Sequence, residues 1–195
     1  MPKRFLLYLL AITFLIVSCR KDMRLFGADV KQTLERFGRE NPETLVKVHT
    51  RLGDFTIKLF EETPLHRANF LRLVKANYYT DRYFYRIVYE TGIQGGGEYF
   101  DRLDYLVPAE YKPEFTHKRG AVGMARYEEG NPEKASSPSE FFIITNEEEA
   151  RKFNGNYVVF GQVTEGMDVV DKIQQARAYD EKPDIPVKFD IEVKE

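Results

Sequence analysis

Short stretches in which apolar and polar residues alternate follow one another through most of the chain. The first two form a hairpin pattern over residues 45–59, with Gly53-Asp54 at its turn. Further stretches of this kind span residues 83–88, 120–125, 140–145, 156–163 and 187–193. A period of two is typical of strands that bury one face, and a helical pattern lies between them over residues 64–77 and 167–176. Many short strands with two helices favour a mainly β fold, a closed or nearly closed antiparallel barrel with helices at its ends.

The amino-terminal 18 residues have a composition of their own. Lys3 and Arg4 precede the uncharged residues 5–17, a stretch shorter than the roughly 20 helical residues that cross a bilayer. The next residues, Ile16-Val17-Ser18-Cys19, resemble the lipobox at which bacterial lipoproteins are cut and acylated. We therefore predict a signal peptide over residues 1–18 and lipidation of Cys19, the only cysteine in the chain. The alternative is an uncleaved signal anchor with an idle thiol.

Residues 19–44 are interpreted as a lipidated tether with a short extra helix. Val30, Leu34 and Phe37 recur at near-helical spacing, and Gly38 follows as an expected C-cap of a helix over residues 29–38. The remaining residues, 45–195, form the predicted globular domain.

Charge and motifs exclude several classes of function. A net charge of -2 and the absence of a basic run with interleaved aromatics argue against a nucleic-acid partner. The three histidines, His49, His66 and His117, fall on a strand, a helix and a loop in no metal-binding or nucleophile motif, so neither a metal nor a cofactor is expected. The run of three glycines at residues 95–97 is interpreted as a tight bend, since no helix pattern follows it as a phosphate cradle would need.

One positive charge is predicted to lie among large apolar side chains. On a strand of period two, Phe84, Arg86 and Val88 share one face. A charge in such surroundings has a function or a partner. The alternative is that Arg86 merely pairs with a carboxylate at the barrel surface.

Arg86 belongs to a set of motifs that resembles the cyclophilins. Phe84-x-Arg86 followed by Ile93-Gln94-Gly95-Gly96 is similar to the signature of that family. Four more blocks resemble the family in the same order: residues 53–70, 120–125, 139–143 and 159–167. The resemblance covers the chain from about residue 45 onward and implies a closed antiparallel eight-stranded barrel capped by two helices, with peptidyl-prolyl cis-trans isomerase (rotamase) activity.

The resemblance also implies residue roles. Arg86 would be catalytic, and Gln94, Ala125, Phe142 and Phe153 would contact the substrate. Neighbouring strand residues point to opposite faces, so Phe141 is assigned to the core and Phe142 to the site. For Phe153 a core position and a site position are both open.

Further substrate-binding positions are assigned where the chain departs from the family pattern. These positions are Thr91, Glu140, Arg126 and Tyr157. Phe84, which matches the family pattern, is also assigned to substrate binding. Tyr85 replaces a histidine that precedes the arginine in the family. Thr91 stands in place of an aromatic residue, which predicts weaker or altered proline binding. Glu140 and Arg126 could form an ion pair across the groove.

Two functions follow from these residues. The first is a monomeric isomerase that acts on proline-containing segments of exported proteins, without metal or cofactor. The second is a cyclophilin-fold chaperone or adaptor that grips such segments with little or no catalysis. Arg20, and not an aspartate, follows Cys19, which favours the outer membrane with the body in the periplasm.

Overall fold

The computed structural model describes residues 29–97 and 103–194, so the predicted signal peptide and Cys19 lie outside the described residues. The helices are α2 (Asp29–Glu40), α3 (Pro64–Lys75), α4 (Glu147–Ala150) with a 3₁₀ turn at Arg151–Phe153, and α5 (Met167–Gln174). The strands are β1 (Leu45–Thr50), β2 (Gly53–Leu59), β3 (Arg82–Val88), β4 (Gly92–Gly96), β5 (Ala121–Met124), β6 (Glu140–Ile144), β7 (Val158–Glu165), β8 (Ala178–Tyr179), β9 (Lys182–Pro183) and β10 (Val187–Val193).

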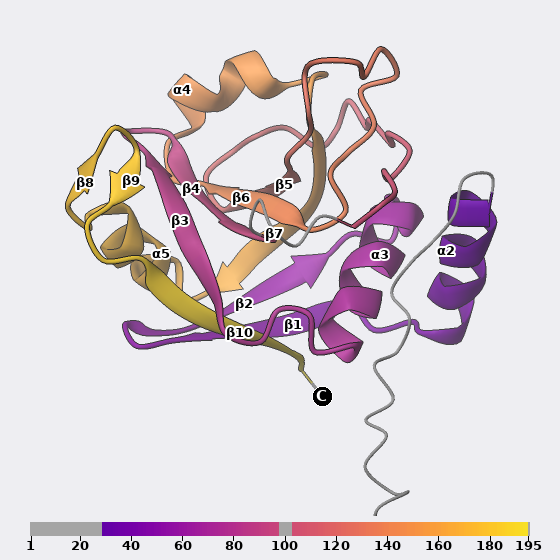
Figure 1. The fold of residues 1–195 in the computed structure, drawn as a ribbon, viewed down its shortest axis with the longest axis horizontal. Helices are drawn as coiled ribbons and strands as arrows, with labels where there is room; N and C mark the ends of the chain where they lie inside the picture. The colour runs from indigo at the N-terminus through magenta and orange to yellow at the C-terminus, as the bar shows by residue number, and fades with distance from the viewer. Residues whose placement is uncertain (1–28, 98–102, 195) are drawn as a thin grey trace, which may run out of the picture.

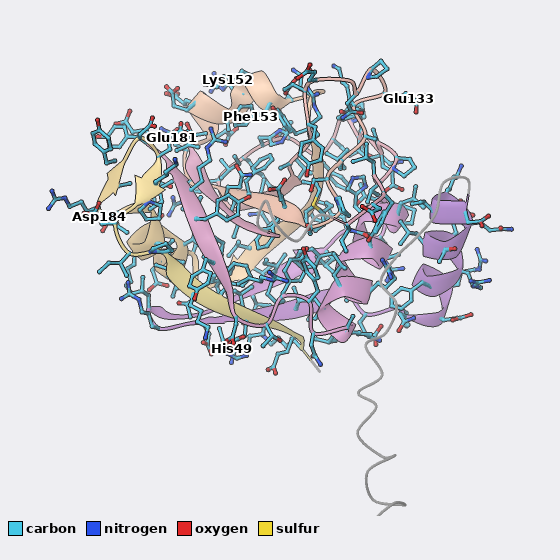
Figure 2. The ribbon with its side chains drawn as sticks, in the orientation of Figure 1. His49, Glu133, Lys152, Phe153, Glu181 and Asp184 are labelled. Carbon is cyan, nitrogen blue, oxygen red and sulfur yellow. The ribbon has the colours of Figure 1, made fainter. Side chains whose placement is uncertain are left out.

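Eight of these strands close into a barrel in the order β1-β10-β3-β4-β6-β5-β7-β2 (Figure 1). Every neighbouring pair runs antiparallel. The closed antiparallel barrel predicted from the alternating pattern is therefore confirmed. The remaining strands, β8 and β9, pair with each other as a small hairpin beside β3. In Figure 2, Phe153 and Glu181 lie in the upper part of the view, whereas His49 lies at the bottom.

Strand β4 corrects one sequence prediction. Its glycines were interpreted as a tight bend, but residues 92–96 pair with β3 on one side and β6 on the other. The strand needs glycine because its neighbours approach very closely: a Cβ on Gly95 would lie 2.8 Å from the Tyr83 carbonyl oxygen and 2.9 Å from the Phe84 ring. Gly96 adopts φ +115, which side chains disfavour.

The barrel interior is filled by aromatic rings that are almost completely shielded from water. The largest are Tyr79, Phe55, Phe70, Phe84, Phe141, Phe160 and Phe189. Phe141 meets Phe70 and Phe84 edge to face, with ring centroids 5.5 and 6.0 Å apart. Each such side chain contributes about 1.5–3 kcal/mol by leaving water, so this cluster is the main source of stability for the barrel.

Helix α3 begins at Pro64, where the missing N–H of proline is tolerated. Thr63 occupies the N-cap position, but its hydroxyl makes no capping bond. The carboxylate of Glu110 instead accepts hydrogen bonds from the free backbone N–H groups of Leu65 (3.1 Å) and His66 (3.0 Å). A carboxylate here also suits the positive end of the helix dipole.

The extra helix α2 packs against α3, and Val30 and Leu34 are buried in that contact. Gly38, expected to end the helix as a C-cap, lies inside it. A Cβ on Gly38 would come within 3.2 Å of the Ala68 Cβ, so glycine lets the two helices approach closely. The buried guanidinium of Arg67 binds the end of the helix, where its nitrogens donate to the carbonyl oxygens of Gly38, Asn41 and Glu43.

Among residues 29–97 and 103–194, no helix combines the length and the apolar character that a membrane crossing requires. The same residues hold no group of three or more histidine, cysteine or acidic side chains arranged to bind a metal ion.

Candidate active site

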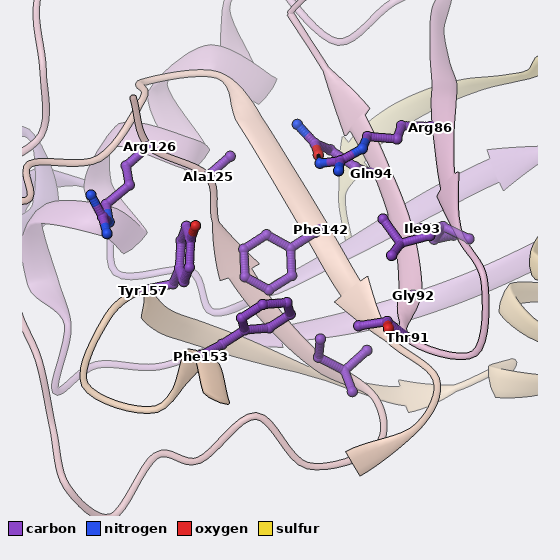
Figure 3. A pocket seen from close by; sticks show the side chains of 12 residues that line it. Arg86, Thr91, Gly92, Ile93, Gln94, Ala125, Arg126, Phe142, Phe153 and Tyr157 are labelled. Carbon is purple, nitrogen blue, oxygen red and sulfur yellow. Dashed lines mark hydrogen bonds between the residues drawn. The ribbon is translucent and has the colours of Figure 1, made fainter. Parts of the chain in front are cut away.

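A pocket of about 220 Å³ opens on the outer face of the barrel, over β3, β4 and β6 and beside the 3₁₀ turn at Arg151–Phe153 (Figure 3). Most of its wall is apolar, and its charged and amide groups belong to two arginines and a glutamine. Its lining residues are Arg86, Val88, Thr91, Gly92, Ile93, Gln94, Ala125, Arg126, Phe142, Ile144, Phe153 and Tyr157.

Strand β3 directs Arg86 outward to this pocket. The pairing of β3 with β4 shifts register between Phe84 and Arg86, where a β-bulge adds one residue. Phe84 therefore points into the core and is 1% exposed, whereas Arg86 and Val88 face outward. The prediction that Phe84 shares the face of Arg86 and contacts substrate is wrong, because the bulge breaks the period of two.

A chain of hydrogen bonds fixes the amide of Gln94. Arg86 Nη1 donates to Gln94 Oε1 (3.0 Å), and Gln94 Nε2 donates to the Tyr85 hydroxyl (3.1 Å). That hydroxyl in turn donates to Glu140 Oε1 (3.0 Å). Burial raises the pKa of Tyr85 well above its usual value, and the Glu140 charge adds to the shift, so the phenol stays protonated.

The second partner of Arg86 is an acid from another part of the chain. Arg86 Nε donates to Glu181 Oε2 on the β8–β9 hairpin at 2.6 Å. The alternative that Arg86 pairs with a surface carboxylate is thus partly correct, but the same guanidinium also lines the pocket. In the described part of the chain, its third nitrogen, Nη2, has no hydrogen-bond partner.

Three aromatic rings form the apolar wall. Phe142 meets Phe153 and Tyr157 edge to face, with ring centroids 5.9 and 5.7 Å apart (Figure 3). Phe141, the preceding residue on β6, is 0% exposed in the barrel core. The opposite orientations predicted for Phe141 and Phe142 are observed. Phe153, for which two positions were open, lines the pocket while part of its ring packs against a small buried cluster.

Arg126 does not reach Glu140. Its Nη1 pairs with Glu128 (3.1 Å), its Nε donates to the Asn156 carbonyl (2.8 Å), and its guanidinium lies over the Tyr157 ring. Glu140 binds Tyr85 at the edge of the site and is absent from the pocket lining. The predicted Glu140–Arg126 ion pair is therefore wrong, because each side chain finds a nearer partner.

Two of the three histidines are buried. His66 hydrogen-bonds through Nδ1 to Glu110 (2.7 Å) and through Nε2 to the Ser136 hydroxyl (2.9 Å). This order of acid, imidazole and hydroxyl resembles a hydrolytic triad, but His66 and Ser136 are 0% and 1% exposed and a substrate cannot reach them. The arrangement connects α3 to the loop that precedes β6.

His117 lies behind the apolar wall and was missed in the sequence. Its ring stacks on Phe142 and meets Phe153 edge to face. Its Nδ1 lies 2.9 Å from Asn154 Oδ1. Burial lowers the pKa of His117, so the ring is neutral near pH 7. No sequence pattern marks a histidine in a long loop as the support of a distant strand residue.

The structure thus brings most of the predicted site residues together. Arg86, Thr91, Gln94, Ala125, Arg126, Phe142, Phe153 and Tyr157 line the pocket. Chemically, the site offers an apolar recess for a small ring, with a guanidinium and an amide at its edge. Such a site can bind an apolar group and place a cationic hydrogen-bond donor beside it.

Known proteins resemble this chain in sequence and in fold. A model of the family described as cyclophilin type peptidyl-prolyl cis-trans isomerase/CLD matches residues 45–193. The chain is 36% identical over 138 residues to a peptidyl-prolyl cis-trans isomerase of Acinetobacter baylyi, covering 67% of this chain and 71% of that one. It is 32% identical over 141 residues to peptidyl-prolyl cis-trans isomerase B of Escherichia coli, covering 67% and 84%.

Solved structures agree. A cyclophilin-type isomerase of Cryptosporidium parvum, crystallised in the presence of the dipeptide Ala-Pro, matches with a TM-score of 0.66 and 26% identity, over 77% of this chain and 99% of that one. Barrel, pocket and motifs define a barrel of the cyclophilin class. This chain belongs to the cyclophilin-type peptidyl-prolyl cis-trans isomerase family.

Proposed function

We propose that the protein accelerates rotation about X-Pro bonds in flexible polypeptide segments, with Arg86 as the catalytic residue. The observation that carries the proposal is the position of the Arg86 guanidinium at the rim of an apolar recess, with Nη2 unpartnered among the described residues. A proline ring seated against Phe142 and Phe153 would place its imide nitrogen near this donor.

The chemistry needs no proton transfer. Amide resonance makes the barrier to rotation about 18–20 kcal/mol, although the cis and trans forms of an X-Pro bond differ by only about 1 kcal/mol. As the bond twists, the nitrogen lone pair leaves resonance and becomes a hydrogen-bond acceptor. A guanidinium aimed at that nitrogen stabilises the twisted state more than either planar state, which is the condition for catalysis. Arginine suits the role because it stays charged and its donors keep fixed directions.

Turnover of a proline peptide tests the proposal directly. Exchange between the cis and trans forms of a short Ala-Pro peptide, followed by NMR, reports catalysis without a coupled protease. We expect Arg86→Ala to lower kcat/KM by about 100-fold, the loss typical of one catalytic donor. Arg119→Ala is the matched control, because Arg119 is similarly exposed and paired with Asp171 but lies outside the pocket lining. Equal turnover in the protein and in Arg86→Ala would remove Arg86 from the mechanism.

A second candidate is a chaperone or adaptor that holds proline segments without accelerating rotation. One observation favours it: Thr91 occupies a pocket position where an aromatic side chain would add apolar area. Retained peptide binding without acceleration of exchange would support this candidate over the enzyme.

We also propose that the protein works outside the cytoplasm on exported polypeptides, anchored through a lipid on Cys19 and favouring the periplasmic side of the outer membrane. The support is the order of segments in residues 1–19: two basic residues, then an uncharged apolar stretch, then a sequence that resembles a lipobox. Metabolic labelling with a radioactive fatty acid in a bacterial host tests it. The label should be incorporated by the full chain and lost in Cys19→Ala. Equal labelling of the full chain and Cys19→Ala, or no labelling of either, would overturn the proposal that Cys19 carries a lipid anchor.

A further inference from the structure

The β8–β9 hairpin places two acidic residues at its tip, directly after Tyr179. Asp180 and Glu181 both adopt positive φ, +49 and +61, the backbone of a two-residue hairpin turn. The hairpin is fixed to the barrel by Pro183, which is buried, and by a backbone bond of 2.8 Å from Ile87 N–H to the Glu181 carbonyl. Glu181 is therefore held beside β3 by its own backbone, and not through its side chain alone.

The side chains of Glu181 and Gln94 bind two different nitrogens of Arg86. Glu181 accepts from Nε at 2.6 Å, and Gln94 accepts from Nη1 at 3.0 Å. Two acceptors on different nitrogens of a planar group determine its position and the direction of its plane. The nitrogen that they leave without a partner in the described structure is Nη2.

Folding stability does not explain this pair. The Arg86 and Glu181 side chains are 45% and 42% exposed, and exposed ion pairs contribute little to stability because water competes for both charges. Orientation is a different matter, because a catalytic donor loses much of its effect when it is misdirected by a small distance.

We propose that Glu181 is a positioning residue for Arg86: its carboxylate, presented by the β8–β9 hairpin, holds the guanidinium so that Nη2 faces the recess. The inference rests on the proposed function of Arg86. The carboxylate binds Nε and leaves the donors of Nη2 free, so it orients the guanidinium without occupying the nitrogen that serves the substrate.

The hairpin offers a matched pair of variants. Glu181→Gly and Asp180→Gly each remove one acid from the same turn, and each relieves a positive φ, so neither is expected to unfold the hairpin. Only the first removes the partner of Arg86. We expect Glu181→Gly to lower kcat about fivefold with KM for an Ala-Pro peptide unchanged within about twofold, because the aromatic wall that grips the ring is untouched. Asp180→Gly should keep the parent kcat and KM.

Glu181→Gln separates charge from direction. An amide oxygen can still accept a hydrogen bond from Nε. The decrease in kcat in Glu181→Gln should therefore be less than half of the decrease in Glu181→Gly. In an Arg86→Ala background, Glu181→Gly should change kcat by less than about 1.5-fold, since a residue that acts through Arg86 has no effect once Arg86 is absent.

A spectroscopic readout makes the test independent of turnover. The Arg86 Nε–H signal in a ¹⁵N spectrum should exchange with water faster in Glu181→Gly than in the parent or in Asp180→Gly. Unchanged exchange would overturn the positioning role whether or not the protein is active. A faster exchange with a parental or higher kcat would overturn it as well, whereas inactivity of the parent itself would refute the proposed function instead.

Discussion

The imidazole of His117 lies almost parallel to the ring of Phe142, with the centroids 5.7 Å apart and the planes inclined by 13°. His117 is 1% exposed, and its Nε2 is buried without a hydrogen-bond partner within the described chain. The wall that would receive a proline ring thus has a titratable group directly behind it. Protonation of that group requires either a buried charge or a shift of the ring.

This contact makes stability depend on pH. Burial lowers the pKa of His117 in the folded protein, whereas the unfolded chain has a pKa near the ordinary value of about 6.5. Between the two values the unfolded state binds more protons, so the free energy of unfolding rises with pH. The contribution is complete above about pH 6.5 and is lost as the pH falls toward the folded-state pKa.

Urea unfolding at pH 7.5 and 5.5 measures this effect. We expect the parent to lose more stability over the interval than His117→Phe, which keeps a ring against Phe142 but cannot titrate. Carboxylates with lowered pKa, such as those of Asp54 and Glu165, lose their contribution mainly below pH 4.5 in both proteins. The same loss in both proteins between pH 7.5 and 5.5 would contradict the assignment to His117.

Gly123 on β5 lies against the ring of Phe142, so a larger residue at this position should narrow the pocket. A Cβ on Gly123 would overlap the far edge of the Phe142 ring, so Gly123→Ala should push that ring toward the pocket. We expect KM for a proline peptide to rise about tenfold, equivalent to about 1.4 kcal/mol, with a smaller change in kcat. The overlap with the Phe142 ring should also destabilise Gly123→Ala. The double variant Gly123→Ala/Phe142→Leu should recover that stability, because the smaller side chain removes the overlap. An unchanged KM in the single variant would show that Phe142 does not grip the ring.

Tyr85 orients the amide of Gln94 through its hydroxyl. Tyr85→Phe removes the acceptor of Gln94 Nε2 and leaves the amide free to rotate its oxygen away from Arg86. We expect a loss of about threefold in kcat and about 1–2 kcal/mol of stability, because the hydroxyl loses two hydrogen bonds, one from Gln94 and one to Glu140. Tyr83→Phe, on the same strand, is the control, since its hydroxyl has no partner within the described structure. An effect of the same size in both variants would argue against a specific role for Tyr85.

Arg67 joins the extra helix to the barrel. Its guanidinium is almost fully buried and donates to three carbonyl oxygens at and beyond the end of α2. We expect Arg67→Ala to cost about 3 kcal/mol in chemical denaturation, because the buried acceptors lose a charged donor. Arg36→Ala, at an exposed position of α2, should change stability by less than about 0.5 kcal/mol. Activity below the unfolding transition should survive in both variants.

The alternation of apolar and polar residues predicted the barrel and the opposite orientations of Phe141 and Phe142. It could do so because consecutive side chains of a regular strand point to opposite faces, which depends only on local geometry. The same rule failed at Phe84, because a bulge adds a residue and nothing in the letters of β3 marks it. Gly38 was misread for a related reason: glycine at a helix end and glycine at a close helix crossing look alike until the partner helix is known.

Long-range partners were beyond prediction. Glu181 lies 95 residues from Arg86, on a turn of sequence Tyr-Asp-Glu-Lys that lacks the glycine by which such turns are usually recognised. His117 and Asn154 likewise meet only through the fold. The motifs placed the pocket correctly because they lie on strands β3, β4, β5 and β6, whose pairing brings them together.

Helix α2 packs on α3, whereas the pocket opens beside the turn that follows α4, on a different side of the barrel (Figure 1). A chain leaving Asp29 toward the amino terminus therefore starts from a face other than the one on which the pocket opens. An affinity tag or a solid support attached at that end should leave kinetics on immobilised protein equal to those in free solution.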